Sequence, residues 1–333
     1  RLDKIEMDST HNRQDYSAMW LASCHYQLGD EKQAQKISPY YYKLSPIDRR
    51  LTIQSDSLSA LADKAFEHQD YTKALKLYKQ CDAIEATILG KNHIWRMTTI
   101  ANEGYCYSQL SDSTNAIKCF EAHQAACQQL YNLECDAAMN TLFALGHEYY
   151  NHQFENHYPK ALNAYFQAYE LAKNLNDSIN YNSSLYCISL CYFSQSQENN
   201  GDEQGKYLEN AEVFVRELRN DNEEDRYLKN LIYDNLANFY NKKSEEYLQD
   251  SITLQQALDY SQKALETYQK KPDADQGVKR LLEIYKMDCL IRSNKIQEAI
   301  ELGEDLYAAF LPIRQQESEN YQTLLQNLSY SYK

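Results

Sequence analysis

Apolar residues along this chain recur three and four positions apart, the spacing that lines one face of an α-helix. The C-terminal stretch "NYQTLLQNLSYSYK" (320–333) is an example, because Leu324, Leu325, Leu328 and Tyr332 fall on one stripe. A period of two, which would indicate half-buried strands, does not dominate. The chain also holds only 8 Gly and 5 Pro, too few for many tight turns. The pattern therefore predicts an all-α protein.

A polar turn followed by an alanine near the start of a helix occurs repeatedly. Clear copies are "YQLGDEKQAQKI" (26–37), "EHQDYTKALKLY" (67–78) and "RSNKIQEAIEL" (292–302). With a weaker copy at Ala211 included, the alanines lie 40 to 50 residues apart, at Ala34, Ala74, Ala116, Ala161, Ala211, Ala257 and Ala299. Self-similarity at such a period is typical of stacked helical repeats.

A second helix pattern precedes each of these turns. A large apolar residue is followed by another, then by a small residue and an aromatic one, as in "LSALADKAF" and "LFALGHEYY". We interpret the small residue as the point where two helices approach closely, with the aromatic ring filling the space beside it. These small residues are Ala22, Ala62, Gly104, Gly146, Ser189, Ala237 and Ser329.

Segments 58–81 ("LSALADKAFEHQDYTKALKLYKQC") and 142–169 resemble the tetratricopeptide repeat (TPR), a helix–turn–helix unit. Pro46 stands where that family has its closing proline, and "SPID" (45–48) reads as a Ser cap with Pro in the first helical turn. The resemblance implies one domain over 1–333, a right-handed α-solenoid of about seven repeats plus an unpaired C-terminal helix. The repeats are expected near 15–48, 55–90, 95–135, 138–176, 180–220, 227–271 and 278–318, with a partial one at 319–333.

The repeats are longer than the usual period of about 34 residues. Segments 194–206 and 241–252 are interpreted as insertions, and "GDEQGK" (201–206) as a flexible loop between helices. The phrase around "LGKNH" (89–93) resembles the linker of kinesin-light-chain-like repeats, although Ile94 replaces the following Pro. Segment 298–333 resembles repeats that precede a caspase-like CHAT protease domain in bacterial proteins.

The Leu-rich stretch 320–333 reads as the first helix of an eighth unit. Repeat arrays need polar caps at their ends. We therefore expect the native chain to continue, and expect self-association through this helix; the alternative is that the helix itself is the cap.

The formal net charge is −14, which disfavours nucleic acid as a direct ligand. The acidic run "NDNEEDR" (220–226) is interpreted as a solvated loop or helix start. No apolar run is long enough to predict a membrane span. Nine scattered cysteines without a C-x-x-C pair suggest core residues in a reducing compartment, so a cytoplasmic location is expected.

Motifs that would carry chemistry are weak. In "HEYYNH", His147 and His152 are five residues apart and so do not share a helix face, unlike the two histidines of a zinc protease motif. Cys187 and Cys191 are spaced one turn apart but have no further ligands nearby, which favours packing. We therefore expect no catalytic residues, no metal and no cofactor, and a chain that is not an enzyme.

In the family that the chain resembles, first helices line a concave groove that binds peptides or protein surfaces. The resemblance assigns such a groove here, without that family's basic carboxylate clamp, and the acidic surface favours a basic or neutral polar partner. Its expected lining residues are Tyr26, Phe66, Tyr105, Gln109, Phe143, His147, Tyr150, Asn151, Tyr186, Phe193 and Asn238. For any one aromatic residue among them, packing between neighbouring units is the competing interpretation.

Two functions remain from the sequence. The first is a non-catalytic interaction scaffold or sensor, in a bacterial protein. The second is the regulatory repeat region of a larger enzyme, a CHAT protease or a sensor kinase, whose catalytic domain lies outside this chain.

Overall fold

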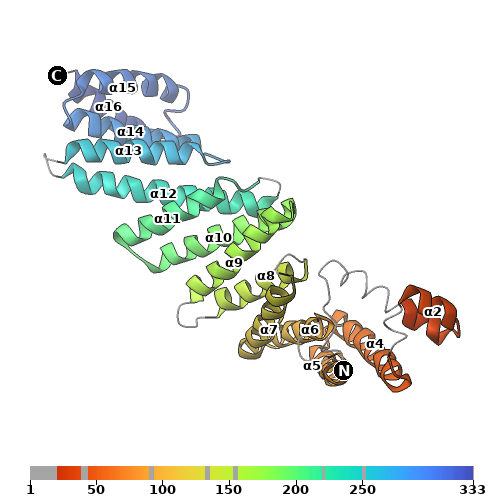
Figure 1. The fold of residues 1–333 in the computed structure, drawn as a ribbon. Helices are drawn as coiled ribbons and strands as arrows, with labels where there is room; N and C mark the ends of the chain where they lie inside the picture. The colour runs from red at the N-terminus through yellow and green to blue at the C-terminus, as the bar shows by residue number, and fades with distance from the viewer. Residues whose placement is uncertain are drawn as a thin grey trace. The chain divides into compact units, whose positions relative to one another are not determined.

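A computed structural model describes residues 21–38, 44–89, 94–131, 136–152, 157–219, 222–249 and 253–332. Within these ranges all regular secondary structure is helical, as the apolar spacing predicted (Figure 1). The chain divides into two compact units, Arg1–Ser184 and Leu185–Lys333, and the division falls inside one helix. Whether the two units form one continuous, right-handed array remains a prediction. None of the helices in the described ranges combines the length and the hydrophobicity needed to cross a membrane.

The first unit is a series of antiparallel helix pairs. Residues 21–27 are helical, and the helices that follow are α2 (Glu31–Ile37), α4 (Pro46–Glu67), α5 (Tyr71–Ile88), α6 (Ile94–Gln109), α7 (Ser113–Tyr131), α8 (Asp136–Asn151) and α9 (His157–Asn174). The helix that crosses into the second unit is α10 (Ser178–Glu198). The second unit continues with α11 (Gly201–Val215), α12 (Glu223–Leu248), α13 (Leu254–Gln269), α14 (Gln276–Arg292), α15 (Ile296–Phe310) and α16 (Ser318–Ser331).

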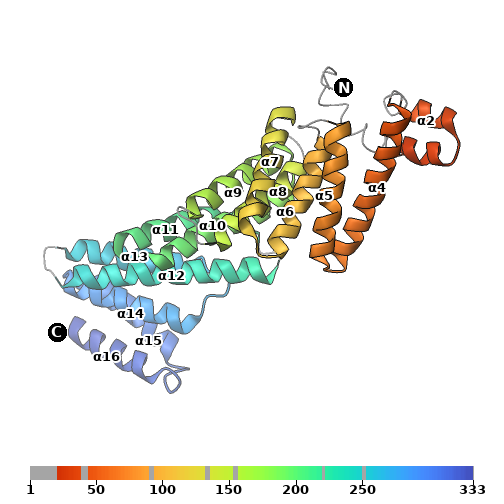
Figure 2. The ribbon, with the colours of Figure 1, turned by 90° about the horizontal axis from the view of Figure 1, so that it is seen from below.

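Helices that follow one another in the chain pack side by side within each unit. In the first unit α4 contacts α5, α5 contacts α6, and so on to α9; in the second unit the same holds from α11 to α16 (Figure 2). First helices of successive pairs also touch: α6 contacts α8, α12 contacts α14, and α14 contacts α16. Each helix thus buries its apolar stripe against its immediate neighbours, which is the packing of a helical-repeat solenoid.

The seven repeat alanines are all fully buried, six of them near the start of a second helix and Ala211 near the end of α11. Ala34, Ala74, Ala116, Ala161, Ala211, Ala257 and Ala299 are all 0% exposed. On the first helices, Gly146 is placed so that an added Cβ would lie 2.4 Å from Cε1 of Tyr165. Small side chains therefore set how closely the two helices of a pair approach.

The turns between helices use a shared local device. A residue in the left-handed region ends one helix, at Gly29, Gln69, Ser111, Asn176 and Asn294. At the first four of these turns, the next residue is an Asp whose carboxylate accepts a backbone N–H three residues on, as Asp70 Oδ1 does from Lys73 at 3.2 Å. The expected cap at "SPID" is also present, since Ser45 Oγ accepts the N–H of Asp48 at 3.1 Å and Pro46 begins α4. Side-chain capping thus marks the starts of α2, α4, α5, α7 and α10.

The interpretation of "GDEQGK" (201–206) as a flexible loop was wrong. Residues 201–206 form the first turns of α11, and Asp202 and Glu203 stand where the helix dipole favours negative charge. Gly205 is needed there, because an added Cβ would lie 2.1 Å from Cζ of Phe239. The inserted segments 194–206 and 241–252 likewise add helix: α10 runs to Glu198 and α12 to Leu248.

The apolar stripe predicted for the last helix is split by the structure. Leu324 and Leu328 are 0% and 8% exposed, because α16 packs against α14 and α15, whereas Leu325 is 40% and Tyr332 61% exposed. Ser329 was expected to be a small residue at a helix contact, but it is exposed on the outer face of α16. No second helix covers that face in the described residues, so the small side chain has no contact to make there.

Candidate functional site

The aromatic residues predicted for the groove of the first unit are half-buried and pack against the second helix of their own pair. The ring centroids of Tyr105 and Phe120 are 5.0 Å apart, and those of Phe143 and Tyr165 are 6.4 Å apart. Tyr150 meets Tyr158 edge-on at 6.1 Å. These contacts favour the packing interpretation for the three predicted residues.

Two further predicted aromatics of the first unit lie in similar settings. Phe66 is edge-on to Tyr71 with centroids 5.2 Å apart, and Tyr26 lies under the guanidinium of Arg49 at 4.9 Å. The polar positions differ, because Gln109, His147 and Asn151 are exposed. The exposed polar side chains of α6 and α8 are thus the predicted positions best placed to meet a partner in this unit.

The histidines of "HEYYNH" point to different neighbours. His147 Nδ1 lies 2.9 Å from the hydroxyl of Tyr165, and His152 Nε2 lies 3.5 Å from a carboxylate oxygen of Glu148. No group of three or more His, Cys, Asp or Glu side chains in the described part of the chain is arranged to hold a metal ion.

The cysteines of the described ranges are mostly core residues. Cys187 and Cys191 are 9% and 0% exposed on α10, as the packing interpretation expected. Burial raises the pKa of Cys81 and Cys106 to about 12, so these thiols are protonated and unreactive near neutral pH. Cys135 and the linker residue His93 lie outside the described residues.

Two buried ionisable groups of the first unit have strongly shifted pKa values. Glu103 on α6 is 8% exposed, and burial, followed by the nearby Asp82 carboxylate, raises its pKa to about 7. Burial lowers the pKa of His123 on α7 to about 4, and its Nδ1 lies 3.0 Å from Thr141 Oγ1. Neither side chain lines any of the cavities described for this structure. We therefore interpret both as buried core residues whose charged forms destabilise the fold.

Glu103→Gln is expected to stabilise the first unit above neutral pH. The pKa of Glu103 in the folded protein is raised from 4.5 to about 7, so folding favours the protonated side chain. The contribution of Glu103 to the free energy of unfolding is therefore complete below pH 4.5 and is lost as pH rises through about 7. Glutamine keeps the shape without the charge and should raise the free energy of unfolding by about 2 kcal/mol at pH 8. Urea melts of both proteins at pH 5 and pH 8 measure this.

The control for that measurement is Glu67→Gln, which removes an exposed carboxylate from α4. It should change stability little at either pH. His123 affects stability in the opposite direction, because the folded protein favours its neutral form and loses stability as pH falls from about 6.5 to about 4. The effect of Glu103 is therefore read from the difference in stability between the variant and the parent protein at each pH. Equal effects of Glu103→Gln at the two pH values would contradict the assignment.

In the second unit, the three predicted groove residues have different surroundings. Phe193 is half-buried against the core cluster that includes Leu208 and Leu236. Asn238 is exposed on α12. Tyr186 on α10 lines an open cavity of about 520 Å³, which places this one predicted residue at a candidate binding site.

The wall of this cavity is formed chiefly by the start of α12. Asn222 caps the helix by accepting the N–H of Asp225 at 2.7 Å, and the helix then presents Glu223, Tyr227 and Asn230 on one face. The opposite face, with Leu228, Ile232 and Leu236, is buried. Tyr227 is 66% exposed, so its ring contributes little to the core. The complete lining is Tyr186, Glu223, Glu224, Arg226, Tyr227, Asn230 and Asp273.

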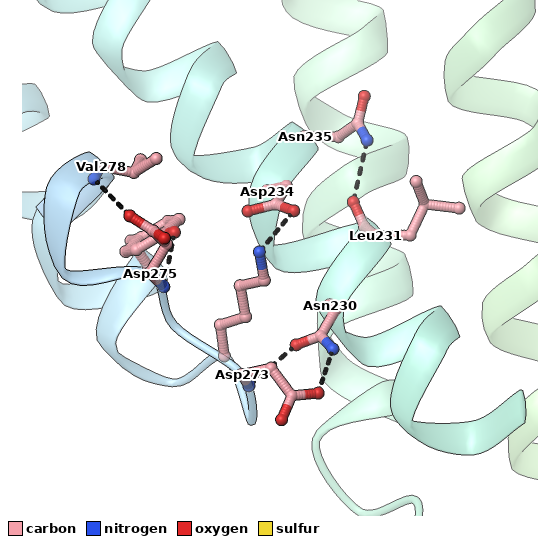
Figure 3. Close-up of polar contacts among 9 residues, drawn as sticks. Asn230, Leu231, Asp234, Asn235, Asp273, Asp275 and Val278 are labelled. Atoms are coloured by element: carbon pink, nitrogen blue, oxygen red, sulfur yellow. Dashed lines mark hydrogen bonds and ion pairs between the residues drawn. The ribbon is translucent and has the colours of Figure 1, made fainter. Parts of the chain in front are cut away.

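The turn between α13 and α14 is fastened to α12 beside the cavity (Figure 3). Asn230 Nδ2 donates to Asp273 Oδ2 at 2.7 Å, and the backbone N–H of Asp273 donates back to Asn230 Oδ1 at 3.2 Å. One helical turn further on, Asp234 pairs with Lys271 at 2.8 Å. Asp275 then caps α14, accepting the N–H groups of Gly277 and Val278. The Asp273 carboxylate is therefore held in a defined position at the rim.

Sequence reasoning missed most of this site. It identified Tyr186 by position in the repeat and saw 220–226 as a solvated loop or helix start, and α12 does begin at Glu223. It did not identify Tyr227, Asn230 or Asp273. A three-and-four spacing of polar and aromatic residues at Glu223, Tyr227, Asn230 and Asp234 was the available signal.

The chain is similar in structure to several solved proteins, but it matches no sequence family. No protein-family model matches the chain, and no curated protein matches it. BtubC (BKLC) from P. vanneervenii is 18% identical, with 87% of this chain and 91% of that chain covered and a TM-score of 0.43. A putative kinesin light chain of Podosopora anserina with TPR-like repeats is 16% identical, with 77% and 94% covered and a TM-score of 0.28. The TPR2AB domain of yeast Sti1, in a complex with pHSP90, is 11% identical, with 85% and 100% covered and a TM-score of 0.42.

The chain's own helix pairs establish the fold class. Six of the described second helices carry a fully buried alanine near their start, α11 carries its buried Ala211 near its end, and first helices of successive pairs touch within each unit. The fold is an all-α repeat solenoid built from helix pairs, as the repeat in the sequence predicted.

Proposed function

We propose that this chain is a non-catalytic protein-interaction scaffold whose first helices bind a segment of a partner protein, basic or neutral polar in character. The cavity beside α10 and α12 carries this proposal. Its lining includes Tyr227, which the sequence did not predict and which is 66% exposed on a first helix, whereas the predicted aromatics Tyr105, Phe143 and Tyr150 pack against the second helices of their pairs. Exposed aromatic rings beside polar groups are typical anchors for a protein ligand.

Charge supports the stated character of the partner. The chain carries a net charge of −14, and the cavity lining has three carboxylates against one guanidinium. Such a surface attracts basic segments, tolerates neutral polar ones and repels acidic ones. Exposed amides at Gln109 on α6, at Asn151 on α8 and at Asn238, further along α12 itself, can donate to and accept from an extended peptide backbone.

Selection from a displayed library of random peptides tests the proposal. The full chain is the bait, and selected peptides are measured against three variants. Tyr227→Ala, Asn238→Ala and the pair Gln109→Ala with Asn151→Ala each remove exposed side chains of first helices without opening a packing hole. We expect at least one of them to weaken binding by about tenfold, as loss of an interface anchor does.

The matched control is Gln262→Ala, on the second helix α13, where the side chain bonds to Glu266 at 2.6 Å. It should leave peptide binding unchanged. Selected peptides whose affinity is insensitive to every first-helix substitution, or no selectable peptide at all, would count against a scaffold that binds through these helices.

Self-association through α16 remains a second element of the proposal. Leu325, Gln326, Ser329 and Tyr330 line an open cavity of about 470 Å³ on its outer face. If copies of the chain join there, Leu325→Glu should lower the fraction of dimer in sedimentation velocity runs at matched concentrations. Concentration-independent sedimentation of the parent protein would contradict self-association.

A further inference from the structure

We infer that the cavity at the start of α12 is a subsite for one cationic side chain of the bound partner, the guanidinium of arginine or the ammonium of lysine. The inference rests on the proposed scaffold function and adds to it the chemistry of one anchor. It assigns the Tyr227 ring as the face on which the cation lies and the carboxylates of Glu223, Glu224 and Asp273 as its counter-charges.

The charge arrangement of the cavity suits a cation. Glu223 and Glu224 are exposed and make no side-chain hydrogen bond or ion pair within the described residues. Asp273 is held toward α12 by its reciprocal hydrogen bonds with Asn230, so one carboxylate is already placed before a ligand arrives (Figure 3). Arg226 is the one cationic side chain in the lining, which leaves the site with an excess of negative charge.

The same unit repeatedly combines tyrosine rings with lysine. Lys263 Nζ lies 5.5 Å and 5.3 Å from the ring centroids of Tyr240 and Tyr260. Lys271 Nζ lies 5.3 Å from the Tyr268 ring while it pairs with Asp234 at 2.8 Å. The cavity offers a ring and carboxylates of the same kind, but its lining includes no lysine. A cation supplied by a partner would complete the arrangement.

Other ligand classes fit less well. The N-terminus of a helix attracts anions, but the first turn of α12 already carries Glu223, Glu224 and Asp225. A bound phosphate or carboxylate would meet these groups at close range. A metal ion needs several converging ligands, and the described residues contain no group of three His, Cys, Asp or Glu so arranged. An organic cation needs only a ring face and nearby negative charge.

A titration with defined peptides tests the inference. The probes are nine-residue peptides of Gly, Ser and Asn that differ only at the central residue: arginine, lysine, citrulline or glutamate. Citrulline has nearly the shape of arginine without its charge. Amide chemical shifts of the ¹⁵N-labelled full chain are followed at low salt. We expect the arginine and lysine peptides to shift residues 223–230 and 273, and the citrulline and glutamate peptides to leave them unshifted.

Variants identify the groups involved. Tyr227→Ala should weaken binding of the arginine peptide by about fivefold. Glu223→Gln with Glu224→Gln should weaken it by a similar factor, and so should raising the salt from about 20 mM to about 200 mM. The control pair Asp259→Asn with Glu266→Gln removes the same charge from exposed sites on α13 and should have less than about a twofold effect.

Three outcomes would overturn the inference: equal shifts with citrulline and arginine, equal weakening by the α13 control pair, or no shift at residues 223–230 with any peptide. The library selection tests the scaffold function separately. Selected peptides that depend on Gln109, Asn151 or Asn238 but bind equally well with neutral residues would leave the scaffold in place and remove the cation subsite.

Discussion

Leu328→Glu is expected to detach α16 from the second unit, whereas Leu325→Glu, on the same helix, should leave the fold intact. Leu328 is 8% exposed, and an added Cβ on Gly303 would lie 2.5 Å from its Cδ2. A carboxylate at this position has no partner in the helix contact, so the cost is about 3–5 kcal/mol. Leu325 is 40% exposed, and a charge there stays in water.

Amide hydrogen exchange measures the difference. In Leu328→Glu, residues 318–331 should lose protection, and the parts of α14 and α15 that they cover should lose some of it. Leu325→Glu serves as the matched control, since it introduces the same side chain three residues away. Full protection of α16 in Leu328→Glu would show that the helix is not held by this contact. Only Leu325→Glu is suited to test self-association, because it leaves the unit folded.

Gly146→Ala is expected to destabilise the first unit even though alanine favours helices. The added Cβ would lie 2.4 Å from Cε1 of Tyr165, which is 2% exposed and whose hydroxyl is 2.9 Å from His147 Nδ1. Because the ring is enclosed, α8 and α9 must move apart. Overpacking of this kind costs about 1–3 kcal/mol, more than the gain of about 1 kcal/mol in helix propensity.

Thermal or urea unfolding measures this effect, and Asn140→Ala on the same helix is the control, because Asn140 is exposed. It should raise stability slightly through propensity alone. A double-mutant cycle with Tyr165→Leu isolates the contact, since Gly146→Ala should cost little once the ring is gone. If Gly146→Ala were as stabilising as Asn140→Ala, close approach at Gly146 would not be what holds this pair together.

The sequence was least informative where several chain segments meet. Tyr105 and Tyr227 are both tyrosines on first helices, yet Tyr105 packs on Phe120 and Tyr227 is 66% exposed. The repeat pattern assigned a groove position to the first and not to the second. Asp273 lines the same cavity as Tyr227 and Asn230, although it lies in a turn 43 residues after Asn230 in the chain. Contacts of that separation leave no periodic signal in the chain.

By itself, the sequence determined the helical class, the repeat alanines and the cap at Ser45, because these depend on residues only a few positions apart in the chain. The sequence misassigned 201–206 as a loop, because a helix start rich in Gly, Asp and Glu has the composition of a loop. The structure shows instead that Gly205 is required within the helix, since the ring of Phe239 occupies the space beside it. Only the tertiary structure decided which of two neighbouring leucines on α16 is buried and which tyrosine on a first helix is left exposed. Burial is a property of what packs against a side chain, and that is supplied by other helices.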